Sequence, residues 1–216
     1  MITVSSIEKS YNLEKVLKGI DFTVNDGEFV SIMGESGSGK STLINIIGGF
    51  LSADSGQVFW DDVEISSLTE KQISEKRCTS MGFVFQSFKL ISTLTAKENV
   101  YLPVSLGKKN SKETDKYIEE IISAFKLDEI MDKYPDQLSG GQCQRVAILR
   151  ALAYQPNTII LDEPTGALDS EMEEIVACFL KRVNKKYKTT IIQVTHSEKV
   201  ASYGDRIIRI KDGKIV

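Results

Sequence analysis

A glycine-rich stretch that follows a short apolar run constrains this chain more than any other feature. Residues 31–49 read SIMGESGSGKSTLINIIGG, and the spacing G-x-x-x-x-G-K-[ST] is met by Gly34, Gly39, Lys40 and Ser41. Each glycine costs about 0.5–1 kcal/mol in chain entropy, so something must offset that loss. A bare backbone lets phosphate oxygens approach main-chain N–H groups, and a following helix directs its positive end at the same anion. We therefore expect a P-loop between a strand and a helix, with Lys40 on the β- and γ-phosphates of a nucleotide and Ser41 on Mg²⁺.

Composition bounds the class of protein. The chain has 216 residues, 41% hydrophobic and 26% charged, which suits one globular domain with a substantial core. Its apolar runs are far shorter than the roughly 18 residues of a bilayer span. The net charge of −3 argues against nucleic-acid binding, and the basic run Lys181–Lys188 fits a solvated helix end better than a binding patch. Because Cys78, Cys143 and Cys178 are odd in number and widely spaced, we expect free thiols in a reducing compartment.

The order of the predicted elements indicates a parallel α/β core with an insertion. Several apolar runs are continuous, as in strands covered on both faces. Strands are expected over Ile2–Ile7, Phe22–Val24, Phe29–Met33, Gln57–Trp60, Met81–Phe85, Thr158–Leu161, Thr189–Thr195 and Arg206–Ile210. Helices are expected after Lys40, from Thr69, after the polar linker Gly107–Lys112, over Gln142–Tyr154, from Ser170 and near Glu198. We therefore expect a single domain, 1–216, with a catalytic α/β core and antiparallel β subdomain in 1–86 and 156–216, and an α-helical subdomain in 87–155.

Two adjacent carboxylates follow the apolar run TIIL and indicate a metal partner. Burying them is costly unless a cation compensates. Consecutive strand residues face opposite sides, so we expect Asp162 in the Mg²⁺ shell and Glu163 polarising the attacking water. His196, the only histidine, follows the next strand, at the edge where open α/β sheets bind ligands. Two surface acids and a structural histidine are the alternatives.

The segment LSGGQ, residues 138–142, has two interpretations. Ser139 and Gln142 have the spacing of a capping box that opens a helix. The same segment also completes a set of motifs: 34–41, Gln86, 138–142, 161–163, 167–169 and His196. In this set and order, and from end to end, the sequence resembles the ATP-binding-cassette (ABC) ATPases.

The resemblance implies further roles. Tyr11 matches the aromatic residue that stacks on adenine, and Gln86 matches the glutamine that senses Mg²⁺ and links to a membrane partner. His196 matches the switch histidine that contacts the γ-phosphate. From the residues alone, Tyr11 could also be an edge-strand aromatic and Gln86 a polar residue at a strand end. The implied nucleotide-binding residues are Tyr11, Gly34, Glu35, Ser36, Gly37, Ser38, Gly39, Lys40, Ser41, Thr42, Gln86, Ser139, Gly140, Gly141, Gln142, Asp162 and Asp169. The implied metal ligands are Ser41, Gln86 and Asp162, and the implied catalytic residues are Lys40, Gln86, Glu163 and His196.

In such cassettes two chains sandwich two ATP molecules head to tail. Ser139 and Gly141 then meet the ATP of the other subunit, and Asp169 belongs to the loop that crosses the interface. The resemblance thus implies a cytoplasmic, Mg²⁺-dependent ATPase that dimerises on ATP and drives separate membrane permeases, with the helical subdomain as the link. Cys143 departs from the Gln or Glu usual at its position, which leaves details of the signature helix open.

The stretch Gly82–Pro103 resembles a narrower subgroup, whose partners export macrolides or peptides, release lipoproteins, or act in cell division and antimicrobial-peptide resistance. Within it, Phe88, Leu90 and Leu94 fit either the core of the insertion or a groove for the partner. The main alternative to transport is an ATPase that signals through a membrane partner in division, cell-wall control or resistance. A DNA-repair or translation ABC ATPase and a small-molecule kinase are weaker alternatives.

Overall fold

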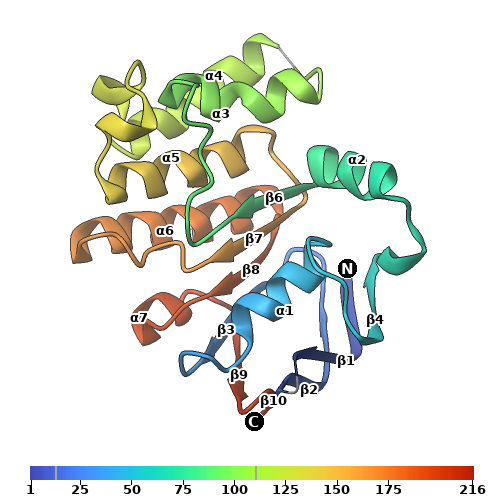
Figure 1. The fold of residues 1–216 in the computed structure, drawn as a ribbon. Coiled ribbons are helices and arrows are strands. Elements are labelled where there is room, and N and C mark those ends of the chain that lie inside the picture. Colours follow the sequence, from blue (N-terminus) through green and yellow to red (C-terminus); the bar gives the residue numbers. More distant parts are fainter. Residues whose placement is uncertain (13, 110) are drawn as a thin grey trace.

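A six-stranded sheet forms the centre of the molecule (Figure 1). The computed structural model describes residues 1–12, 14–109 and 111–216, so Asn110 of the expected linker lies outside the described residues. The strand order is β10-β9-β3-β8-β7-β6, and every pairing is parallel except β9 with β10. The strands are β3 (Phe29–Gly34), β6 (Met81–Val84), β7 (Thr158–Asp162), β8 (Thr190–Val194), β9 (Arg206–Lys211) and β10 (Lys214–Ile215). Parallel pairing brings the ends of β3, β7 and β8 to one edge.

A second, antiparallel sheet is built from the first third of the chain. Its order is β2-β1-β4-β5, with β1 (Ile2–Tyr11), β2 (Glu14–Val24), β4 (Ser55–Trp60) and β5 (Val63–Glu64). The pairing of β1 with β2 contains register shifts, so the two long strands bend. The combination confirms the expected α/β fold with an antiparallel β subdomain.

Helices cover both faces of the central sheet and extend above it. They are α1 (Lys40–Ile47), α2 (Glu70–Ser80), α3 (Ala96–Leu106), α4 (Lys112–Ala124), α5 (Gly140–Ala153), α6 (Ser170–Tyr187) and α7 (Glu198–Ala201). Figure 1 shows α3, α4 and α5 gathered at the end of the molecule farthest from the C-terminus. None of the helices among the described residues is both long and apolar enough to cross a bilayer.

The core has two parts, one on each face of the sheet. One face carries Phe29, Leu161 and Ile191, which pack with side chains of α3 to α6. The opposite face carries Ile32 and Ile192, which pack with α1 and the antiparallel sheet. Strand alternation divides the residues between the faces, and coverage of both explains why these strands are almost wholly apolar.

The bounds of several predicted elements were wrong. The strand expected over Ile2–Ile7 continues to Tyr11 as β1. The segment Phe22–Val24 is only the end of a strand that begins at Glu14. The first half of β2 does not alternate polar and apolar residues, and it pairs with β1 through register shifts, so it carries no strand pattern in the sequence. The helix expected from Gln142 begins at Gly140. Gln142 is the third helical residue of the capping box, so the helix starts two residues before it.

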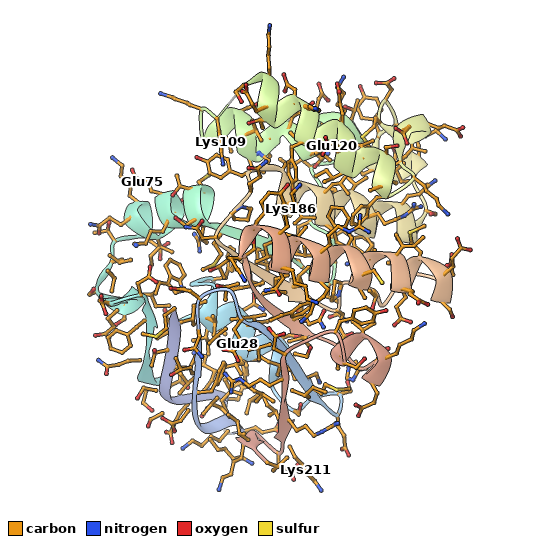
Figure 2. All side chains as sticks on the ribbon, turned by 180° about the vertical axis from the view of Figure 1, so that it is seen from behind. Glu28, Glu75, Lys109, Glu120, Lys186 and Lys211 are labelled. Atoms are coloured by element: carbon orange, nitrogen blue, oxygen red, sulfur yellow. The ribbon has the colours of Figure 1, made fainter. Side chains whose placement is uncertain are left out.

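The basic run at the end of α6 is a helix end, as expected. The helix ends at Tyr187, and Lys188 caps it in the left-handed conformation. Figure 2 shows Lys186 at this end of α6, with Glu120 on the helix above it. Lys181 pairs with Asp205 at 2.6 Å. The three cysteines are free: Cys143 is buried, Cys78 half-buried and Cys178 exposed.

Candidate nucleotide site

The glycine-rich loop joins β3 to the first turn of α1. Gly39 caps α1 with φ of 96°, a left-handed conformation that disfavours side chains. A Cβ there would also lie 2.7 Å from Leu17 Cδ2. Gly39 is therefore required both by the turn and by contact with β2.

Gly34 has a reason to be glycine that the sequence did not reveal. A Cβ on Gly34 would lie 2.2 Å from the carbonyl oxygen of Ile210 and 2.8 Å from Ser38 Oγ. From the sequence, the approach of phosphate oxygens is the only expected reason for a bare backbone here. In the structure, close packing against β9 already excludes a side chain at this position.

The side chain of Lys40 is almost buried inside the loop. Its Nζ donates to the carbonyl oxygens of Gly34 at 2.9 Å and Glu35 at 2.7 Å. Burial lowers the pKa of Lys40, and the carboxylates of Glu163 and Asp162 act to raise it. The ammonium group is thus held at one point, as recognition of an anion requires.

Asp162 and Ser41 meet below the loop. Ser41 Oγ donates to Asp162 Oδ1 at 3.1 Å, and Asp162 is 5% exposed. Burial raises the pKa of Asp162, whereas Ser41 and the Lys40 charge act to lower it. A buried carboxylate beside a hydroxyl supplies the hard oxygen ligands that Mg²⁺ prefers, so this pair fits the expected ion.

Glu163 leaves the line of β7, which corrects one step of the sequence analysis. The strand ends at Asp162, and Glu163 has φ of 51°. The two carboxylates therefore separate through a left-handed turn and not through strand alternation. Such a conformation in a residue other than glycine stores strain, which is typical of functional positions.

His196 lies beside Glu163. Its Nε2 is 3.1 Å from Glu163 Oε1, but hydrogen-bond geometry is not met, and this buried oxygen has no donor among the described residues. Burial raises the pKa of Glu163, the His196 ring acts to lower it, and Asp162 adds to the rise. Glu163 thus keeps one buried carboxylate oxygen that accepts no hydrogen bond from the described residues.

A cavity of about 230 Å³ brings most of the predicted residues together. It is lined by Tyr11, Val16, Ser36, Gly37, Gly39, Lys40, Ser41, Thr42, Gln86, Glu163 and His196. Tyr11, at the end of β1, is 48% exposed, as suits a residue that stacks on a ligand. Val16 was missed because the sequence analysis did not recognise the first half of β2.

The LSGGQ residues and Asp169 do not line this cavity. Ser139 is exposed and caps α5, where Ser139 Oγ accepts from Gln142 N and Gln142 Oε1 accepts from Ser139 N. The capping-box interpretation is thereby confirmed. Asp169 caps α6 through a single bond, in which Asp169 Oδ1 accepts from Met172 N at 2.9 Å. Both Ser139 and Asp169 are therefore exposed and lie outside the lining of their own chain's cavity.

The loop after Gln86 is anchored by a residue that sequence reasoning missed. Phe88 and Lys89 both have positive φ, of 59° and 50°. Arg150 of α5 donates to the carbonyl oxygens of Lys89 at 2.6 Å and Phe88 at 2.8 Å. The arginine holds two strained residues in place and ties the Gln86 loop to α5, the helix that Ser139 caps.

The parallel sheet, the glycine loop capping α1 and the acidic end of β7 define a P-loop nucleotide-binding protein. The profile of the family described as ABC transporter matches residues 17–166. The chain is 43% identical to the bacitracin export ATP-binding protein BceA of Halalkalibacterium halodurans, covering 100% of this chain and 87% of that protein. It is 42% identical to the lipoprotein-releasing system ATP-binding protein LolD of Cytophaga hutchinsonii, covering 100% and 99%.

A solved structure gives the same result. The dimeric, post-hydrolysis ATP-binding cassette MJ0796 of Methanocaldococcus jannaschii, bound to ADP and Pi, matches with a TM-score of 0.93 at 41% identity. The match covers 100% of this chain and 96% of that one. The chain belongs to the ABC transporter family and is an ATP-binding cassette of that family.

Proposed function

We propose that this chain is the Mg²⁺-dependent ATP-hydrolysing motor of an ABC transporter, which dimerises on ATP and drives separate permease subunits. The observation that carries the proposal is the buried Glu163 Oε1, which lies beside His196 at the mouth of the Lys40 loop and accepts no hydrogen bond among the described residues. An acceptor at this position suits a general base toward water.

The binding roles follow from the contacts. Lys40 and the N-terminus of α1 would hold the β- and γ-phosphates, and Tyr11 would stack on the base. Ser41, Asp162 and the amide of Gln86 would hold Mg²⁺, which when bound would neutralise charge on the phosphoryl oxygens. The cavity that joins Lys40, Ser41 and Gln86 supports this assignment.

Hydrolysis requires a proton acceptor and an ordered γ-phosphate. Glu163 would take a proton from the attacking water while the oxygen of that water forms a bond to the γ-phosphorus. The bond between the γ-phosphorus and the β–γ bridging oxygen would break at the same time, giving ADP and phosphate. The raised pKa of Glu163 makes it a better base than an exposed carboxylate. His196 would hold the γ-phosphate and fix the orientation of Glu163.

The second half of each site would come from a second copy of the chain. Ser139, Gly140, Gly141 and Gln142 open α5, whose N-terminus is exposed and suited to a phosphate of the partner copy. Asp169 lies on another outward-facing loop. The dimeric form of the related cassette MJ0796 supports this arrangement.

An apolar groove supports a permease partner. A hollow of about 410 Å³ lies between β6 and the helical region, and its lining includes Phe50, Ile91 and Leu106, which are 43%, 41% and 62% exposed. Phe88 and Leu90 instead pack against the core. This distinction favours the core interpretation for those two residues and a docking role for the exposed three. Residues 87–155 would then act as a helical subdomain that transmits motion.

The relatives named for bacitracin export and lipoprotein release favour a chain that serves export or extraction of a peptide, antibiotic or lipoprotein. The chain would then lie in the cytoplasm, against the inner face of the membrane through its permease. Signalling through a membrane partner without transport, in division, cell-wall control or peptide resistance, remains the second candidate, because the same motor residues serve both. Movement of substrate in vesicles that carry the permease distinguishes the two.

The decisive variant is Glu163→Gln. Because it removes the base and keeps the shape, ATP turnover should fall by ~10²-fold or more while ATP binding persists. Phosphate release and nucleotide binding are measured side by side. Glu171→Gln, which alters an exposed ion pair on α6, is the matched control and should hydrolyse ATP normally. Undiminished turnover in Glu163→Gln would refute the proposed base.

A further inference from the structure

Two buried polar residues interrupt an otherwise apolar face of the central sheet. Ser31 of β3 and Gln193 of β8 are neighbours in the parallel register, and neither is exposed to solvent. Phe29, Ile191 and Leu161 surround them on the same face. Polar groups in such a place need hydrogen bonds, and the location of their partners indicates their role.

All partners of this pair lead to α7. Gln193 Nε2 donates to Ser31 Oγ at 2.9 Å and to the Val200 carbonyl oxygen at 3.1 Å. Ser31 Oγ donates in turn to the Ala201 carbonyl oxygen at 2.9 Å. The last turn of α7 is therefore attached to the middle of the sheet.

The segment attached in this way adjoins His196 in the chain. A helix of four residues is too short to hold its own shape, so α7 depends on such tertiary contacts. Ser197 caps α7 through Val200 N and donates its own N–H to Thr195 Oγ1 at 3.1 Å. His196 lies between these two, so the end of β8 and the anchored α7 fix it from both sides (Figure 1).

Stability alone does not account for Gln193. Its Oε1 accepts no hydrogen bond among the described residues, and an unpaired buried acceptor is destabilising. A methionine would fill similar volume on this apolar face without that cost. The Gln193 amide is therefore explained by the two hydrogen bonds that Nε2 donates, to Ser31 Oγ and to the Val200 carbonyl oxygen of α7.

We propose that Gln193, together with Ser31, is a positioning residue that anchors α7 and thereby places the His196 ring beside Glu163. The inference rests on the proposed ATPase function only for its kinetic consequence. The placement of the ring is a structural claim, and it can be measured without hydrolysis.

The first test uses the single histidine of the chain. The His196 side chain is already half exposed, so the informative signature is loss of its fixed place beside Glu163. In Gln193→Met, the ring signals of His196 in an NMR spectrum should shift away from their wild-type positions, while the melting temperature is kept or raised. Asn184→Leu is the control, because the Asn184 amide is also buried and donates to two carbonyl oxygens, of Gly27 and Thr189, at 2.8 Å. In Asn184→Leu, the ring signals of His196 should stay at their wild-type positions. Unmoved ring signals in Gln193→Met would overturn the inference.

The second test is kinetic. A displaced group near the reacting atoms costs on the order of 10- to 100-fold in rate, so kcat of Gln193→Met should fall by that factor with KM for ATP unchanged. In a His196→Ala chain, Gln193→Met should lower kcat no further, because both substitutions remove the same contribution of the placed His196 ring. Losses that multiply in the double variant would contradict the inference.

The two readouts separate this inference from the proposed function. Moved ring signals in a chain whose wild type hydrolyses no ATP would support the positioning role and refute the motor. Normal ATP hydrolysis by the wild type, with unmoved ring signals in Gln193→Met, would support the motor and refute the positioning role. If Gln193→Met does not fold, Ser31→Ala removes the neighbouring donor with a smaller change, and the same displacement and coupling are expected of it.

Discussion

At the scale of single residues, the glycine loop is constrained by the fold as well as by its ligand. Gly34 lies against the backbone of β9, and Gly39 lies against β2. A motif usually explained by phosphate binding is therefore also a packing motif. Its glycines should matter for stability in the absence of any nucleotide.

Gly34→Ala tests this point. The new Cβ would lie 2.2 Å from a carbonyl oxygen that belongs to the backbone and cannot rotate away. Such overpacking should lower the free energy of unfolding by about 1–3 kcal/mol, measured by urea denaturation without nucleotide. Gly140→Ala, where nothing lies within 4 Å of the new Cβ, is the control and should lose no stability. Equal stability of Gly34→Ala and wild type would argue against the packing role.

Some residues at the candidate site are recognisable from a local sequence motif, whereas others act only through contacts with segments distant in the sequence. Lys40 and Ser41 could be predicted because the motif and its function are local in sequence. Arg150 and Gln193 could not, because each acts on a segment brought near by folding. The turn at Glu163 was also hidden, since residue type alone does not reveal a left-handed φ.

At the scale of elements, an ion pair joins the turn before β3 to β9. Arg206 Nε lies 2.5 Å from Glu28 Oε1, and Asn25 N donates to Glu28 Oε2 at 2.8 Å. Figure 2 places Glu28 among the strands of the lower sheet region. Burial acts to raise the pKa of Glu28, but the bonds from Arg206 and Asn25 outweigh it, and the net pKa lies below its usual value.

This pairing predicts a pH-dependent stability. A lowered pKa means that the folded state favours the charged form, so the stabilisation is present above the usual pKa of 4.5 and is lost as pH falls through the lower folded value. Glu28→Gln should cost about 0.5–1 kcal/mol at pH 7 and progressively less below pH 4.5. Urea midpoints across this range give the difference. Glu75→Gln, at an exposed position of α2, should match wild type throughout, and a loss in Glu28→Gln that is independent of pH would exclude the charge as its cause.

The elements themselves were predictable where one face or both are buried. Continuous apolar runs identified β3, β7 and β8, and the Thr69 capping box identified the start of α2. The two-residue strands β5 and β10 were not predicted, because so short a segment carries no periodicity and forms only by pairing with a neighbour.

At the scale of the whole molecule, the two sets of residues proposed for the nucleotide site lie apart within one chain. The cavity holds the Lys40 loop, while Ser139 and Asp169 lie elsewhere. Under the proposed function, one chain would therefore not close its own site around a nucleotide. A second copy, which turns its Ser139 toward the first, would complete both sites.

The assembly follows from this division. Glu163→Gln with Mg²⁺ and ATP should form a dimer, measured by light scattering, because unhydrolysed ATP bridges the two copies. Adding Ser139→Arg should abolish the dimer and preserve ATP binding, since the bulky cation occupies the place of the second phosphate contact. Monomers in saturating nucleotide, or a dimer that survives Ser139→Arg, would contradict the arrangement.

Contacts of β2 couple the two sheets. Val16 and Leu17 lie against Gly39. The Val16 carbonyl oxygen also packs against Gly213, so closely that a side chain at Gly213 would collide with it. Lys18 N donates to the Gly213 carbonyl oxygen at 2.9 Å. The strand that follows Tyr11 thus rests on the phosphate loop and on the β9–β10 hairpin at once. We therefore expect a tilt of the antiparallel sheet to carry the loop with it. Binding of a base at Tyr11 and binding of phosphates at the loop, both proposed above, would then be mechanically coupled.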